Sequence, residues 1–134
     1  MASRSSLDTI ARWLIALFFV ASGTAKIFAF QPSAAIMVSD GVPIPHFFLI
    51  VIITLEVGGG LGLLFGLWTR YVSAILILFL ILASIVFHAR FMGDPVSGPD
   101  QFVHLIKNIA IIGGLIYVVA GGGSFSLDAP ARRA

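Results

Sequence analysis

The sequence contains no cysteine and few charged residues. None of its 134 residues is cysteine, and only 10% are Asp, Glu, Lys or Arg. The absence of cysteine excludes disulfides, thiol–disulfide exchange, cysteine-ligated iron–sulfur clusters and covalent c-type haem. Soluble domains carry roughly 25% charged residues, so this chain lacks the surface that a soluble fold needs. A net charge of +2, with scattered basic residues, also argues against nucleic-acid binding.

Hydrophobic residues make up most of the chain, at 59%, and the mean hydropathy is +1.08. Four apolar runs are long enough to cross a hydrocarbon core about 30 Å thick as helices. We therefore predict an all-α fold, a transmembrane four-helix bundle that forms a single domain over residues 1–134. The predicted spans cover about residues 12–30, 46–67, 70–88 and 102–120.

Proline, glycine and polar residues separate these runs. Residues 31–45 contain three prolines and are predicted as a loop, with room for a turn of helix around 34–38. Residues 89–102 form the second predicted loop. The link at 68–69 is so short that the second and third spans should form an antiparallel hairpin. Residues 121–123, all glycine, should end the fourth span.

The first span could be mistaken for a signal peptide, because Gly23-Thr24-Ala25 resembles a cleavage site. The apolar run resumes at Ile27, so we expect an uncleaved span. The bias of Lys and Arg predicts that both termini are cytoplasmic. The predicted cytoplasmic side carries Arg4, Arg12, Arg70, Arg132 and Arg133. The other side carries Arg90.

Glu56 is the exceptional residue, because it lies inside the second span. It follows His46 by ten residues, which places it about 15 Å along the helix. An acidic side chain at the centre of a membrane helix costs about 2.5 kcal/mol or more. We therefore expect Glu56 to face other helices and to find a cation or a hydrogen-bond donor, or to stay protonated.

Helical spacing and depth predict which side chains accompany Glu56 in one half of the bundle. On this basis Glu56 is the candidate catalytic residue. The candidate ligand-binding residues are Lys26, His88, His104, Lys107 and Asn108. No metal site is predicted.

Each of these residues also has a structural interpretation. Glu56 could form an ion pair with Lys26 or Lys107 that only sets the order of the helices. Each lysine could instead extend its amine to the membrane interface, and the histidines could be interfacial polar residues. His88 and His104 could ligate a b-type haem, but no helix carries two histidines at ligand spacing. Glycines 59, 62 and 66 form a strip that predicts close helix packing.

At these residues the sequence resembles the DoxX family of small four-span membrane proteins. The matching segments are RWLIALFFVASGTAKIF (12–28), DGVPIP (40–45), LEVGGGLGLLFGLWTR (55–70) and FVHLIKNIAIIGGLIYVVAGGGSFSLD (102–128). The resemblance implies a four-helix bundle with both termini inside, in a bacterial inner membrane. It also implies a link to respiratory quinone chemistry, since some members are subunits of quinone-reducing sulfur-oxidising complexes. The resemblance does not imply a set of catalytic residues that all members of the family share.

These observations favour an integral membrane subunit of quinone-linked redox metabolism, with a polar site around Glu56 and quinone as its ligand. A quinone needs an apolar slot, donors for its carbonyl groups and a group that relays protons. The chain has no evident electron carrier, so it would be at most an accessory or quinone-binding subunit beside a redox partner.

Three other functions remain open at this stage. The first is a non-catalytic membrane scaffold or assembly factor for an oxidoreductase complex, which uses the glycine strip for helix packing and partner contact. The second is a small transporter that uses Glu56 as its coupling group. The third is a lipid-modifying activity. Formation of a homo-oligomer also stays open.

Overall fold

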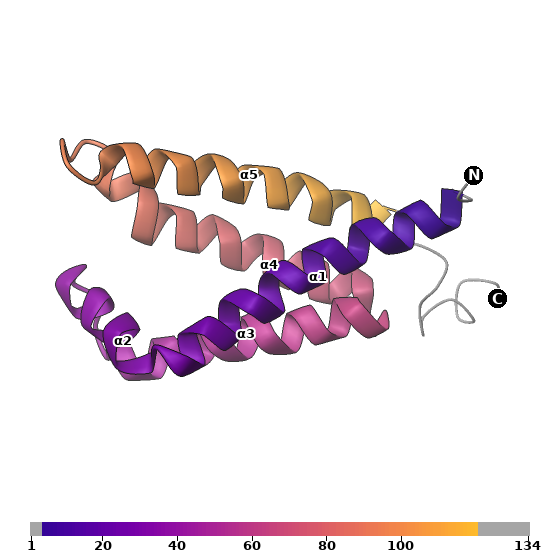
Figure 1. Ribbon diagram of the computed structural model, residues 1–134, viewed down its shortest axis with the longest axis horizontal. Coiled ribbons are helices and arrows are strands. Elements are labelled where there is room, and N and C mark those ends of the chain that lie inside the picture. Colours follow the sequence, from indigo (N-terminus) through magenta and orange to yellow (C-terminus); the bar gives the residue numbers. More distant parts are fainter. Residues whose placement is uncertain (1–3, 121–134) are drawn as a thin grey trace.

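The computed structural model describes residues 4–120, and every regular element in that range is helical (Figure 1). Four helices are long and apolar enough to span a membrane, which confirms the predicted fold class. The predictions for Gly121–Gly123, Arg132 and Arg133 concern residues outside the described range. The elements are α1 (Arg4–Phe28), α2 (Phe30–Ser39), α3 (Pro45–Phe65), α4 (Thr69–Ala83), the π-helical turn η1 (Ser84–His88), the short 3₁₀ turn η2 (Ala89–Phe91) and α5 (Gly98–Ala120).

Two helices extend beyond the predicted spans at their N-terminal ends. α1 begins at Arg4, before the predicted span start at about residue 12, and α5 begins at Gly98, before the predicted span start at about residue 102. In α5, Pro99 occupies the first turn, where its missing N–H costs nothing, and Asp100 stands at the positive end of the helix dipole. Predicting spans from apolar runs misses such polar helical ends.

Helix α2 corrects the prediction that residues 31–45 form a loop. Nine of these residues, 31–39, belong to the helix, because Ala34 and Met37 are buried against Leu49 of α3. Pro32 does not prevent this, since it lies in the first turn of α2. The sequence predicted only a turn of helix around residues 34–38. The three prolines of the segment were given more weight than the spacing of Ala34 and Met37.

The bundle consists of two helix pairs that diverge from one end. α1 packs mainly against α3, and α4 mainly against α5. The pairs meet where α1 begins and α5 ends, and they separate toward α2 (Figure 1). The main apolar core fills the closed end and consists of Ala16, Phe19, Leu63, Leu76, Leu80, Leu115 and Val118.

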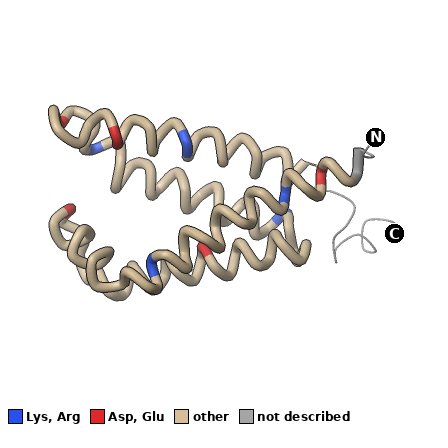
Figure 2. The backbone as a smooth tube through the Cα atoms, viewed as in Figure 1, with Lys and Arg blue, Asp and Glu red and all other residues tan. Residues whose placement is uncertain are grey.

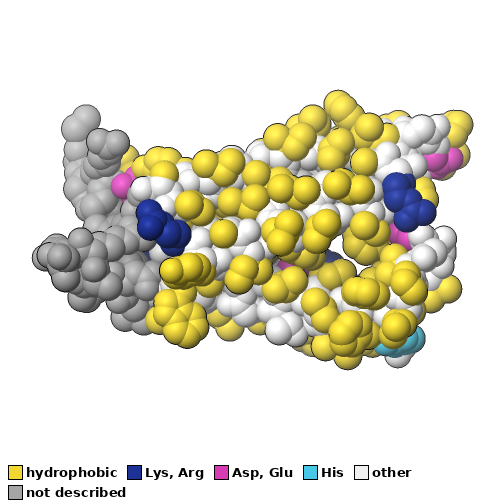
Figure 3. All heavy atoms as spheres, turned by 180° about the vertical axis from the view of Figure 1, so that it is seen from behind, with side chains coloured by type: hydrophobic (Ala, Val, Ile, Leu, Met, Phe, Trp, Pro, Cys, Tyr) yellow, Lys and Arg dark blue, Asp and Glu magenta, His cyan; other side chains and the backbone are white. Residues whose placement is uncertain are grey.

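The outer surface is suited to lipid. Large apolar side chains on all four spanning helices are exposed, among them Leu17, Ile50, Leu78 and Ile109. Figure 3 shows one such face, with hydrophobic side chains across its middle. Charged residues lie mainly near the helix ends, with a few along the middle of the bundle (Figure 2).

The start of α1 and the end of α5 lie at the same end of the bundle (Figure 1). An even number of spans requires this arrangement. Which side of the membrane this end faces stays a prediction.

Two glycines of α3 allow α4 to approach closely. A Cβ atom on Gly59 would lie 2.9 Å from Leu76 Cδ2, and one on Gly62 would lie 3.3 Å from Val72 Cγ2. The predicted close helix packing is therefore present at these two positions. Gly66 has a different role, because it ends α3 with a φ of 69° in the left-handed region that favours glycine.

Asp94 stabilises the turn in the connection between η2 and α5 through hydrogen bonds with Ser97. Its Oδ2 accepts hydrogen bonds from the Ser97 backbone N at 2.8 Å and from Ser97 Oγ at 2.5 Å. These bonds favour the charged carboxylate, and they lower the pKa of Asp94 below its usual value.

Candidate functional site

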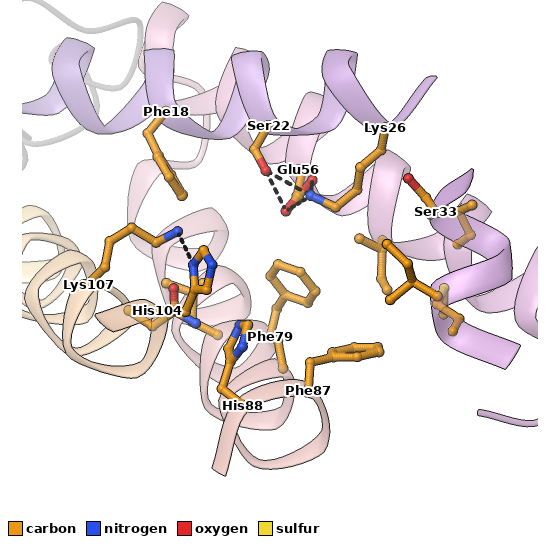
Figure 4. A pocket seen from close by; sticks show the side chains of 17 residues that line it. Phe18, Ser22, Lys26, Ser33, Glu56, Phe79, Phe87, His88, His104 and Lys107 are labelled. Atoms are coloured by element: carbon orange, nitrogen blue, oxygen red, sulfur yellow. Dashed lines mark hydrogen bonds and ion pairs between the residues drawn. The ribbon is translucent and has the colours of Figure 1, made fainter. Parts of the chain in front are cut away.

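A cavity of about 380 Å³ lies between the separated ends of the two helix pairs (Figure 4). The six residues proposed from the sequence come from four different elements, and all of them line it. The structure therefore brings together Lys26, Glu56, His88, His104, Lys107 and Asn108.

One side of the cavity, the glutamate wall, consists of Ser22, Lys26 and Glu56. Lys26 Nζ donates to Glu56 Oε2 at 2.9 Å and to Oε1 at 3.2 Å. Ser22 Oγ donates to Glu56 Oε1 at 3.2 Å and accepts from Lys26 Nζ at 2.8 Å. The Glu56 side chain is only 7% exposed, and that of Lys26 is 32% exposed. The ion pair joins α1 to α3, so Glu56 has a structural role whatever else it does.

Gly23 allows this wall to form. A Cβ atom on Gly23 would lie 2.7 Å from Val57 Cγ2 and 3.0 Å from Glu56 Cβ. α1 therefore approaches α3 closely beside the carboxylate. Ser22 and Lys26 are one turn apart on α1, so both reach the same carboxylate.

The opposite side, the histidine wall, consists of His88, His104, Lys107 and Asn108. The rings of His88 and His104 stack with centroids 5.1 Å apart and planes 19° apart. Lys107 Nζ lies 3.2 Å from His104 Nδ1. Since a charged lysine can only donate, His104 Nδ1 is the acceptor and the proton of the neutral ring is on Nε2. His88 Nδ1 lies 2.7 Å from Gln101 Oε1, which accepts a hydrogen bond from the Nδ1–H group.

Asn108 connects α5 to the end of α4. Its Nδ2 donates to Ser84 Oγ at 3.1 Å, and Ser84 Oγ donates to the Leu80 carbonyl at 2.6 Å. Ser84 opens the π-helical turn η1, in which the Ala89 N–H bonds to the Ser84 carbonyl five residues back. The wider turn changes which side chains share a face after the end of α4. It places Phe87 and His88 together on the cavity lining.

Replacing Ser84 with alanine is expected to lower the free energy of unfolding by about 1 kcal/mol. The buried amide of Asn108 would lose its acceptor, and an unsatisfied buried donor costs about that much. Thermal denaturation in detergent would measure the change. Ser39→Ala is a matched control, because Ser39 Oγ bonds only the exposed Ile36 carbonyl. Equal effects of the two substitutions would contradict the role given to Ser84.

The rest of the lining is mainly apolar, and part of it is shared with a second cavity of about 500 Å³. The second cavity lies along α3 and α4, and Arg90 is its one charged lining residue. The two cavities therefore adjoin across a thin apolar partition. The shared residues are Met37, Ile52, Phe79, Ala83 and Phe87.

Sequence reasoning missed several residues of the site. Ser33 and Met37 line the cavity from α2, which was expected to be a loop. Their spacing of one helical turn was the signal that could have found them. Gln101, which orients His88, gave no signal, since it was placed in a loop. The described part of the chain has no cluster of three or more His, Asp or Glu side chains that could hold a metal ion.

The chain is similar to two bacterial inner membrane proteins. The chain is 34% identical over 120 residues to inner membrane protein YqjF of Escherichia coli, covering 89% of this chain and 87% of that protein. It is 30% identical over 130 residues to inner membrane protein YphA of the same organism, covering 95% and 91%. No solved structure matches it.

With four spanning helices and these relatives, the chain is a multi-pass protein of a bacterial inner membrane. Residues 7–89 match DoxX. That segment contains Lys26, Glu56 and His88 and ends before α5. The chain belongs to the DoxX family.

Proposed function

We propose that the protein is a quinone-binding subunit of membrane redox metabolism, and that the cavity between the two walls holds the quinone head group. The observation that carries this proposal is the placement of polar groups on opposite walls of an otherwise apolar cavity (Figure 4). Small-molecule sites typically combine an apolar lining with a few convergent polar groups.

The two walls match the two ends of a quinone ring. On one side, the partly exposed ammonium group of Lys26 can donate to a carbonyl oxygen, and Glu56 can exchange a proton. On the other side, Lys107 and His104 Nε2–H are donors. A quinone needs donors at both carbonyl oxygens and a proton route for its reduction, and this arrangement offers both.

The second cavity suits the tail of the same molecule. Its lining is apolar apart from Arg90, and it adjoins the first cavity at Phe79 and Phe87. An isoprenoid tail that extends from the head group past Phe79 and Phe87 would reach the lipid-facing side of α3 and α4. The electrons would come from a flavin- or metal-containing partner protein.

The test is extraction and mass spectrometry of small molecules retained by the gently solubilised protein, with a visible spectrum of the same sample. Wild type should retain quinone, and Glu56→Gln should retain about tenfold less, because a charged hydrogen-bond partner in the cavity is lost. Asp94→Asn is the matched control. It makes the same chemical change in the connection before α5, away from the cavity.

Equal retention by wild type and Glu56→Gln would contradict a site built around Glu56. The absence of quinone from all three proteins would contradict the proposal as a whole. A stoichiometric partner that co-purifies equally with wild type and Glu56→Gln would then favour the scaffold function.

A further inference from the structure

The charges that line the first cavity do not balance. Two lysines and one glutamate line it, so with neutral histidines the lining carries one excess positive charge. Lys26 is neutralised by Glu56 at 2.9 Å. The excess charge therefore belongs to Lys107, on the opposite wall.

Lys107 has no anionic partner among residues 4–120. No carboxylate in that range lies within ion-pair distance of it; its contacts are His104 Nδ1 at 3.2 Å and the face of the Phe18 ring at 5.4 Å. Asp100, in the first turn of α5, does not line the cavity. Both contacts of Lys107 are electron-rich but neutral, so neither cancels its charge.

The direction of the Lys107 side chain is also informative. A lysine on a membrane helix usually extends its amine toward the interface. Lys107 instead crosses toward Phe18 of α1 and lies over the cavity with His104 (Figure 4). Lys107 and His104 are exposed at the cavity, so a ligand can reach the amine, and a charge-assisted hydrogen bond from Lys107 to an anion is stronger than one between neutral groups.

We propose that the cavity selects amphipathic ligands whose head group is an anion, held by Lys107 beside the His88–His104 stack. The apolar remainder of the ligand lies against Phe79 and Phe87, where the second cavity begins. This inference uses the same cavity as the proposed function and goes further by naming the charge of the head group. A quinone with an ionised ring hydroxyl and a fatty acid both have this chemistry.

The test compares three probes by equilibrium dialysis at neutral pH against protein in lipid nanodiscs, with empty nanodiscs as the correction for partitioning. The probes are an alkyl hydroxynaphthoquinone, which is anionic at neutral pH, its neutral methyl ether, and laurate. Wild type should bind the hydroxynaphthoquinone about tenfold more tightly than its ether. Lys107→Gln should reduce this preference to within about twofold, and Lys107→Arg should keep it.

The outcomes separate this inference from the proposed function. Equal affinity of wild type for the two quinones, unchanged in Lys107→Gln, would overturn the anionic selectivity and leave quinone binding supported. Lys107-dependent binding of laurate with no binding of either quinone would support the anionic site and overturn the quinone function. If no probe binds above the empty nanodiscs, both are overturned.

Discussion

Replacing Lys26 with methionine is expected to lower the free energy of unfolding by about 2 to 3 kcal/mol. The Glu56 carboxyl group is nearly buried and would lose its cation, and removing one partner of a buried ion pair costs about 3 to 5 kcal/mol. The expected loss is smaller because Lys26 is 32% exposed, so part of the ion pair is already screened. Unfolding in mixed detergent micelles, followed by circular dichroism, would measure it.

Two further variants make this prediction specific to the ion pair. Lys26→Arg should retain most of the stability, since arginine can also bind the carboxylate. Lys26→Met combined with Glu56→Leu should be within about 1 kcal/mol of wild type, because an apolar pair of similar volume replaces a buried charge pair with little cost. If the double variant is less stable than Lys26→Met, the ion pair is not the cause of the loss.

Replacing Gly60 with alanine is expected to lower the free energy of unfolding by about 2 kcal/mol. The new Cβ atom would lie 2.7 Å from Val20 Cγ2, 2.9 Å from Val20 N and 3.1 Å from the Ala16 carbonyl oxygen. Two of these are backbone atoms of α1, so the helices must move apart, and overpacking of this kind costs about 1 to 3 kcal/mol. Gly60 is one turn from Glu56, so the same movement should lengthen the contact with Lys26.

Gly58→Ala is the matched control, because it lies on the same helix and a Cβ atom there would meet nothing within 4 Å. Its stability should equal or slightly exceed that of wild type, since alanine favours helix more than glycine does. Thermal denaturation of both variants would check the pair. Similar losses in the two would show that the effect comes from helix propensity and not from the contact between α1 and α3.

The sequence predicted the spanning helices because apolar runs of this length are a local property. It also predicted that Glu56, Lys26 and the polar residues of the last two spans share one part of the bundle. That prediction needed only the rise per residue and the helix order. The structure places all six on one cavity, while their functional roles stay predictions.

Three features that shape the cavity could not be derived from the rise per residue and the order of the helices. α2 depends on burial of Ala34 and Met37 against α3, which outweighs the local effect of Pro32. The π-helical turn η1 accompanies the hydrogen bond between Asn108 and Ser84, two residues far apart in the chain.

The choice of partner for Glu56 is the third such feature. Helical spacing allowed either Lys26 or Lys107 to pair with it. Glycines 23 and 60 bring α1 against α3, so Lys26 reaches the carboxylate at 2.9 Å, while the separation of the helix pairs leaves Lys107 across the cavity. The sequence by itself thus determined the class of fold and the residues that carry charge into the bundle. Only the tertiary packing decided which of the two lysines is neutralised, because that depends on distances between helices that no local pattern contains.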